Sequence, residues 1–231
     1  MSLVLSLFPG IGLLDRAFEE EGFCVVRGPD LIWGGDIKQF HPPSGKFDGV
    51  IGGPPCQVFS SLANLARHQG TLKATNLIPE FERCVQEAAP QWFVMENVPR
   101  APPPRTPSYD VFSFLLNNRW CGGLQNRVRR ISFGTHTGMK INIAGETFEE
   151  IDSKPAVTAS RGYPRLGGGN RKIKRRSIPK YSLREAITLQ GLPEDFDVPS
   201  FTREALRRAV GNGVPYPMAL AIARAVREVV P

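Results

Sequence analysis

The stretch FDGVIGGPPCQVFS, residues 47–60, joins a short apolar run to a cysteine set among glycines and prolines. The apolar run is typical of a buried parallel strand. Ligands bind α/β sheets at the carboxyl ends of such strands, so Cys56 is placed where a bound molecule would lie. A second apolar run, WFVMENV, begins at Trp92 and contains Glu96 near its end. A thiol and a carboxylic acid at neighbouring strand ends indicate covalent catalysis on a substrate that must also be protonated.

The fold class follows from strand-like and helix-like segments that alternate along the chain. This alternation predicts an α/β fold with a doubly wound, mostly parallel sheet. A Ser182–Glu185 capping box predicts where one late helix begins. The expected strands are Leu3–Phe8, Phe23–Val26, Phe47–Ile51, Trp92–Met95 and Arg129–Phe133. The expected helices are Leu13–Glu21, Leu77–Ala88, Val111–Asn117, Ser182–Leu189 and Met218–Val229.

The bulk properties suit one domain with a small satellite. The chain has 231 residues, of which 41% are hydrophobic, enough for a substantial core. We expect a larger domain made of residues 1–135 and 203–231, and a small basic region at 136–202. No apolar run reaches the length of a membrane span, and the apolar N-terminus reads as a first strand. The four cysteines lack metal-ligand spacing, which indicates reduced thiols, no metal site and a cytoplasmic protein.

The positive charge is concentrated in one segment. The net charge is +7, and residues 153–180 contain no Asp or Glu. A solvated loop would explain such a run, but its one-sided excess favours contact with phosphates. The candidate contact residues are Arg161, Arg165, Arg171, Lys172, Lys174, Arg175 and Arg176.

A glycine turn and two aspartates suggest a ligand site near the N-terminus. The sequence FPGIG, residues 8–12, lies between an expected strand and helix, where backbone amides can meet a ligand. It lacks the spacing of a dinucleotide fingerprint. Asp30 follows the second strand, where a carboxylate can accept hydrogen bonds from ribose hydroxyls. Asp36 follows a glycine pair, although either aspartate alone is as consistent with an ordinary turn.

Taken together, the motifs resemble those of the cytosine-5 DNA methyltransferases. The resemblance runs from about Leu3 to Val226 and leaves only the basic middle unmatched. The matching segments, in order, are LSLFPGIG, GGDI, GGPPCQVFS, MENV, QNRVRR, LQGLP and GNGVPYPMA. The resemblance implies an S-adenosylmethionine-dependent methyltransferase fold, with the larger domain catalytic and the basic region recognising the target.

The resemblance also implies a role for each matched residue. Cys56 would add to carbon 6 of cytosine, Glu96 would protonate the ring, and Arg129 would meet the base carbonyl. Arg127 would organise the catalytic loop or the phosphates. S-adenosylmethionine would be held by Phe8, Gly10, Ile11, Gly12, Asp30, Asp36, Ile37, Pro54 and Asn212. Gln57 and Ser60 join the basic residues as candidate DNA contacts, and the target base would be flipped out of the duplex.

Two other functions remain open at this point. The same chemistry serves a cytosine in an RNA loop that is already unstacked. A non-catalytic DNA-binding relative is the second alternative. We expect duplex DNA as the partner, with a cognate restriction endonuclease as a further candidate partner. We also expect the protein to be a monomer and to be bacterial and associated with the nucleoid. Only five residues separate Asp30 from Asp36, which predicts a thin wall on one side of the cofactor site.

Overall fold

The computed structural model describes residues 2–55, 57–59, 75–145, 154–158 and 181–230. Cys56, Ser60 and the basic residues between 161 and 176 lie outside the described residues, as does the side chain of Gln57. In the part of the chain that is described, no helix is long and apolar enough to span a membrane.

The core of the fold is a six-stranded sheet with the order β2-β1-β3-β4-β7-β5. Neighbouring strands from β2 to β4 pair in parallel, whereas β7 is antiparallel to both β4 and β5. The strands are β1 (Leu3–Leu7), β2 (Cys24–Arg27), β3 (Gly49–Gly52), β4 (Trp92–Asn97), β5 (Asp110–Asn117) and β7 (Val128–Thr135). The mostly parallel α/β sheet expected from the sequence is therefore confirmed.

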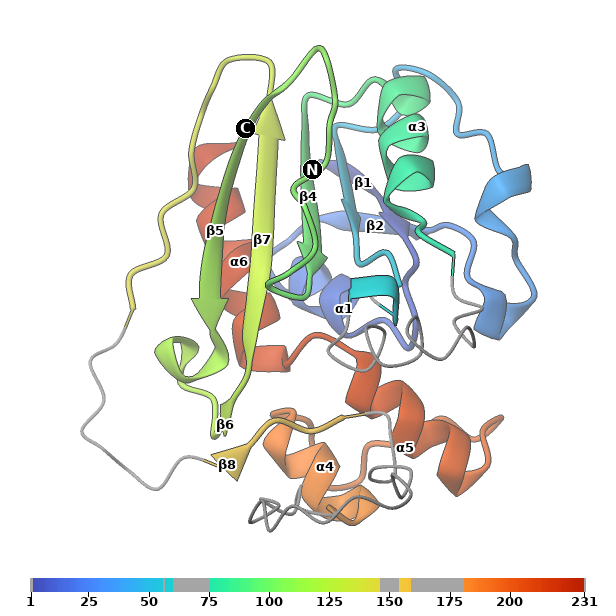
Figure 1. The fold of residues 1–231 in the computed structure, drawn as a ribbon, viewed down its shortest axis with the longest axis vertical. Helices are drawn as coiled ribbons and strands as arrows, with labels where there is room; N and C mark the ends of the chain where they lie inside the picture. The colour runs from blue at the N-terminus through green and yellow to red at the C-terminus, as the bar shows by residue number, and fades with distance from the viewer. Residues whose placement is uncertain (1, 56, 60–74, 146–153, 159–180, 231) are drawn as a thin grey trace, which may run out of the picture.

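Helices cover both faces of this sheet, so the body has three layers (Figure 1). Helices α1 (Leu13–Glu20) and α6 (Tyr216–Val229) pack in one hydrophobic cluster that includes Phe18, Trp92 and Ile222. Helix α3 (Ile78–Ala88) packs in a second cluster that includes Phe81 and Phe93. The carboxyl ends of the parallel strands meet at one edge, which is where an α/β sheet binds ligands.

A smaller lobe lies beyond that edge (Figure 1). It contains β6 (Gln125–Asn126), β8 (Lys154–Pro155), α4 (Leu183–Leu189) and α5 (Arg203–Asn212). A third hydrophobic cluster joins Leu13 of α1 to Ile187, Leu192 and Leu206 of this lobe. Because α4 and α5 share one cluster, the domain boundary expected at residues 202 and 203 passes through packed side chains.

Most of the expected helices and strands are present with ends shifted by one or two residues, but two segments differ in kind from the expectation. Residues 111–117, expected as a helix, form strand β5, so that prediction is wrong. In VFSFLL the side chains alternate with a period of two between the sheet faces, and aromatic residues favour a strand. Helix α5 was not predicted; its N-cap is Thr202, whose side chain accepts a hydrogen bond from the Ala205 N–H. The capping box of Ser182 and Glu185 is present as expected.

Short 3₁₀ helices complete the connections around the sheet edge. They are η1 (Leu31–Trp33), η2 (Ile37–Gln39), η3 (Gln57–Phe59) and η4 (Asn118–Cys121). Asp30 caps η1 and Asp36 caps η2, each through its own side chain. Both aspartates are thus turn residues, and the turns they form border the site described next.

Candidate active site

The glycine turn between β1 and α1, residues 8–12, has an unusual backbone conformation. Phe8 has φ 56°, Gly10 φ 58° and Gly12 φ 76°, all in the left-handed region. Such values are uncommon for a residue other than glycine, and at Phe8 they mark local strain of the kind that functional sites retain. The Gly12 N–H donates to the Pro9 carbonyl at 2.8 Å. The turn therefore presents peptide groups at the N-terminus of α1.

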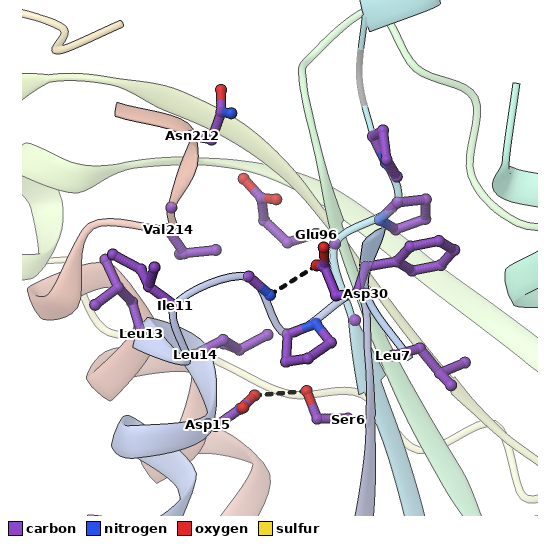
Figure 2. Close-up of a pocket in the computed structure, with 18 of the residues that line it drawn as sticks. Ser6, Leu7, Ile11, Leu13, Leu14, Asp15, Asp30, Glu96, Asn212 and Val214 are labelled. Carbon is purple, nitrogen blue, oxygen red and sulfur yellow. Dashed lines mark hydrogen bonds between the residues drawn. The ribbon is translucent and has the colours of Figure 1, made fainter. Parts of the chain in front are cut away.

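The Asp30 carboxylate is hydrogen-bonded to this turn. Its Oδ2 accepts a hydrogen bond from the Gly10 N–H at 2.9 Å, and its Oδ1 accepts one from the Ile32 N–H at 2.9 Å. The first of these bonds appears as a dashed line in Figure 2. A carboxylate has about four acceptor positions, so both oxygens keep capacity for a ligand hydroxyl.

A pocket of about 320 Å³ opens beside the turn. It lies between the carboxyl ends of β1, β3 and β4 and the end of α5. Figure 2 shows Glu96 between Asn212 and Asp30, side chains from three segments far apart in sequence. The residues predicted from the sequence that line this pocket are Phe8, Gly10, Ile11, Asp30, Pro54, Glu96, Arg129 and Asn212.

A second pocket of about 310 Å³ adjoins the first. Asp36 and Ile37 line it, whereas neither lines the first pocket. The residues common to both linings are Phe8, Asp30, Leu31 and Pro55. The two pockets thus meet at Asp30, and together they form a site with two compartments. Both volumes are at the lower end of the range for small-ligand pockets, about 300–1,000 Å³.

Glu96 and Arg129 form an ion pair at the first pocket. Arg129 Nε lies 2.8 Å from Glu96 Oε1, and the two side chains are 16% and 11% exposed. Glu96 is the last but one residue of β4, and Arg129 is the second residue of the antiparallel strand β7, so sheet pairing brings them close together. Arg129 also donates to the Val128 carbonyl at 2.8 Å. These contacts fix the carboxylate while one face of it remains open to the pocket.

Asn97 fixes the segment that leads to Cys56. It is buried, and its Nδ2 donates to the Pro54 carbonyl at 3.1 Å. Its Oδ1 accepts a hydrogen bond from the Val98 N–H at 2.8 Å. The loop after β3 is thereby held against the end of β4, beside Glu96.

Arg127 lies just before β7 and lines neither pocket. Its buried guanidinium donates to the Val157 carbonyl, to the Gly211 carbonyl at 3.1 Å and to the Gly213 carbonyl at 3.0 Å. Gly211 and Gly213 flank Asn212 of the pocket. Arg127 therefore joins the start of β7 to the smaller lobe and to one wall of the pocket.

Two buried glutamines reinforce this junction. Gln125 Nε2 donates to the Leu189 carbonyl and to Gln190 Oε1, both at 2.7 Å, while its Oε1 accepts from the Val157 N–H at 2.9 Å. Gln190 in turn donates to the carbonyls of Val210 and Gly213. The glutamines of QNRVRR and LQGLP are thus structural partners, which the separate motifs did not indicate.

A buried carboxylate lies beneath the glycine turn. Asp15 is fully buried, accepts a hydrogen bond from the Ser6 hydroxyl at 2.5 Å and pairs with Arg27 at 3.0 Å. Burial raises the pKa of Asp15, although Ser6 and Arg27 oppose the shift. Ser6 and Asp15 both line the first pocket (Figure 2). This charged group at the site was not among the residues predicted from the sequence.

Several predicted residues do not line the pockets, and others line them without having been predicted. Gly12 lines neither pocket and instead precedes α1 as its N-cap. Leu31 and Ile32 line the first pocket unpredicted. The signal in the sequence was the apolar triplet LIW in a stretch too short for a strand. Among the described residues, no group of three His, Cys, Asp or Glu side chains could hold a metal ion.

A doubly wound sheet with a strained glycine turn, an acidic residue after β2 and a pocket at the strand ends is typical of cofactor-binding α/β proteins, a class that includes the methyltransferases. The chain belongs to the family of C-5 cytosine-specific DNA methylases, whose model matches residues 32–163 and 150–228. The resemblance expected from the motifs is thereby confirmed.

Individual relatives agree with this assignment. The chain is 30% identical to the type II methyltransferase M.FnuDI of Fusobacterium nucleatum over 173 residues, 60% of this chain and 48% of that protein. It is 24% identical to M.HgiDI of Herpetosiphon aurantiacus across 96% of this chain and 93% of that protein. The chain thus spans about half the length of the first relative.

Solved structures support the fold. The structure of the Entamoeba histolytica methyltransferase EhMeth superposes with a TM-score of 0.67 at 12% identity, covering 99% of this chain and 98% of that one. At 12% identity, this superposition shows that the two proteins share the arrangement of helices and strands.

Proposed function

We propose that this protein transfers a methyl group from S-adenosylmethionine to carbon 5 of cytosine in duplex DNA. One observation carries the proposal: the Glu96–Arg129 pair faces the same pocket as the glycine turn. Pro54 and Pro55, which directly precede Cys56, line that pocket as well. A carboxyl, a guanidinium and the stem of the cysteine loop therefore meet at one cavity, as addition to a cytosine ring requires.

The residues that line the two compartments suit S-adenosylmethionine in their chemistry. Asp30 stands where they meet, with acceptor capacity for ribose hydroxyls. Asp36 and Ile37 would hold the adenine in the second compartment. Phe8, Gly10, Ile11, Pro54 and Asn212 would surround the remainder of the cofactor. When bound there, the cofactor supplies an electrophilic methyl group.

The residues of this chain would then activate the base. The Cys56 thiolate would add to carbon 6 of cytosine, which makes carbon 5 nucleophilic toward the methyl group. Loss of the carbon 5 proton and elimination of the thiolate from carbon 6 would then release the methylated base and free Cys56. Glu96, oriented by Arg129, would hydrogen-bond to the ring nitrogen and protonate it as the thiolate adds. Arg129 would contact the carbonyl oxygen of the base. Arg127, from its contacts around Asn212, would act by positioning.

The target base must leave the DNA stack before the thiol can reach its ring. We propose that the smaller lobe takes part in this step. The basic stretch 153–180 contains β8 and is followed in the sequence by α4, and both of these elements belong to that lobe. Lysine and arginine contacts to phosphates would orient the duplex over the carboxyl edge of the sheet. A cognate restriction endonuclease remains a proposed partner, because the relatives named above are type II methyltransferases.

The test is methyl transfer from radiolabelled S-adenosylmethionine to duplex DNA of mixed sequence, with transfer RNA in parallel. We expect label in DNA, located at carbon 5 of cytosine by bisulfite sequencing. Cys56→Ser and Glu96→Gln should remove the labelling, whereas Cys24→Ser, at an exposed thiol on β2, should retain it. Label in transfer RNA alone would move the substrate to RNA. A protein that binds the cofactor and labels neither nucleic acid would overturn the proposal.

A further inference from the structure

Trp33 is a large aromatic residue that neither core packing nor the pockets explain. It ends η1, is 52% exposed and lines neither pocket. Its indole Nε1–H nevertheless donates to the Gly10 carbonyl at 2.7 Å. An exposed indole that makes a directed bond to the glycine turn suggests a role at that turn.

The bond completes a clamp on one residue, Gly10, by holding the peptide groups on both sides of its Cα. Asp30 accepts from the Gly10 N–H and Trp33 donates to the Gly10 carbonyl, and both residues belong to one four-residue segment. Gly10 has φ 58°, in the region where only glycine is unstrained. Glycine is also the most flexible residue when it is not held. The segment after β2 therefore fixes a turn that the turn residues alone would leave free to vary.

The same indole reaches the smaller lobe. Its ring lies 5.2 Å from the Phe201 ring, centroid to centroid, at an interplanar angle of 39°. Phe201 directly precedes Thr202, the N-cap of α5, and α5 ends at Asn212 in the wall of the first pocket. One side chain thus contacts the glycine turn that lines the pocket and also Phe201, which precedes the helix that ends at Asn212 of the same pocket.

We propose that Trp33 is a positioning residue that holds the glycine turn in its cofactor-binding shape and couples it to the smaller lobe through Phe201. The inference rests on the proposed function, in which the first pocket receives S-adenosylmethionine. It requires the indole N–H for the turn and the aromatic ring for the lobe, so the two contacts can be removed separately.

The experiment measures S-adenosylmethionine affinity by calorimetry on the full chain. Trp33→Phe keeps an aromatic ring and removes the N–H; it should raise the dissociation constant about 3- to 10-fold, the range of one neutral hydrogen bond. Phe201→Leu keeps the indole bond and should raise the constant about 2- to 3-fold by the same measure. The combined variant should fall short of the product of the two effects, because both contacts act through one side chain.

Trp120→Phe is the matched control, since Trp120 is 48% exposed on η4 and lines neither pocket. It should leave the affinity unchanged. Cofactor binding should also shift the tryptophan emission of the wild type and of this control, and the shift should be smaller in Phe201→Leu, which keeps the Trp33 indole. Because a purely structural role would lower the urea midpoint without this spectral change, the two readouts are separable.

The possible outcomes separate the proposed role of Trp33 from the proposed binding of S-adenosylmethionine. If the wild type binds the cofactor and Trp33→Phe binds it within twofold, the positioning role is overturned. Multiplicative effects in the combined variant would remove the coupling to the smaller lobe. If the wild type does not bind S-adenosylmethionine at all, both the inference and the proposed cofactor site fail. If Trp33→Phe does not fold, Phe201→Leu still tests the coupling, and an unchanged affinity there contradicts it.

Discussion

Arg127→Met should lower the free energy of unfolding more than substitution of an exposed charged residue does, because Arg127 holds the smaller lobe against the sheet. Methionine preserves much of the side-chain length but removes every donor. The carbonyls of Val157 and Gly211 then lose a buried charge-assisted partner. The Gly213 carbonyl keeps the Gln190 amide as a donor.

The magnitude follows from those contacts. Leaving a buried acceptor unsatisfied costs about 1–3 kcal/mol. With two carbonyls losing the donor, and with partial relaxation of the lobe, we expect the free energy of unfolding to fall by about 2–5 kcal/mol. Since the Gly211 carbonyl directly precedes Asn212 in the pocket wall, S-adenosylmethionine affinity should fall in parallel.

Urea denaturation followed by circular dichroism measures the change. Arg184→Met is the control, because Arg184 pairs with Glu194 on the surface, with side chains 76% and 72% exposed. Such a pair contributes about 0–1 kcal/mol. Arg127→Lys should lie between the two, since one ammonium cannot span three carbonyls. A loss for Arg127→Met no larger than that for Arg184→Met would refute the reasoning.

Three further predictions concern the site and the sheet. Glu96→Gln should slow methyl transfer by at least ~100-fold, the scale of lost general acid catalysis, while calorimetry shows cofactor affinity within threefold; a rate within tenfold of wild type would contradict the role. Burial raises the pKa of Asp15, so the native state binds the Asp15 proton more tightly than the unfolded state does. The free energy of unfolding of the wild type, relative to that of Asp15→Asn, should therefore decline as the pH rises from the ordinary aspartate pKa toward neutrality. Urea titrations across that interval test this, and a difference independent of pH would count against it. In Gly134→Ala the new Cβ would lie 2.2 Å from the Phe93 ring, so we expect a loss of about 1–3 kcal/mol by thermal unfolding, against about 0.5 kcal/mol or less for Gly145→Ala, whose nearest neighbour is 3.6 Å away.

Local chemistry in the sequence predicted the parts of the fold that depend on neighbours in the chain. The Ser182–Glu185 capping box determines its helix start by contacts within four residues, and the buried strand before Cys56 is evident from its apolar run. Strand β5 was mistaken for a helix because a short apolar segment such as VFSFLL is compatible with either structure. Its pairing with β7, which no local pattern shows, decides its conformation.

The site divides in the same way. Asp30, Glu96, Arg129 and Asn212 could be named from motifs, and the structure brings them to one pocket. The partners of Arg127 could not be predicted, because Gly211 and Val157 are joined to it only by tertiary folding. The role of Trp33 could not be predicted for a similar reason, because its hydrogen bond to Gly10 spans 23 residues and uses a backbone carbonyl.

The packing of α6 against α1 has a consequence for how the chain is made. Arg224 of α6 pairs with Glu21 after α1, 203 positions earlier, and the two helices complete one face of the sheet together. During synthesis that apolar face stays uncovered until α6 has left the ribosome, although β1 to β4 are already available to pair. Long-range closure of this kind is slow and leaves the nascent chain prone to association. Growth temperature and chaperone supply should therefore govern the yield of folded protein more strongly than any single surface residue does.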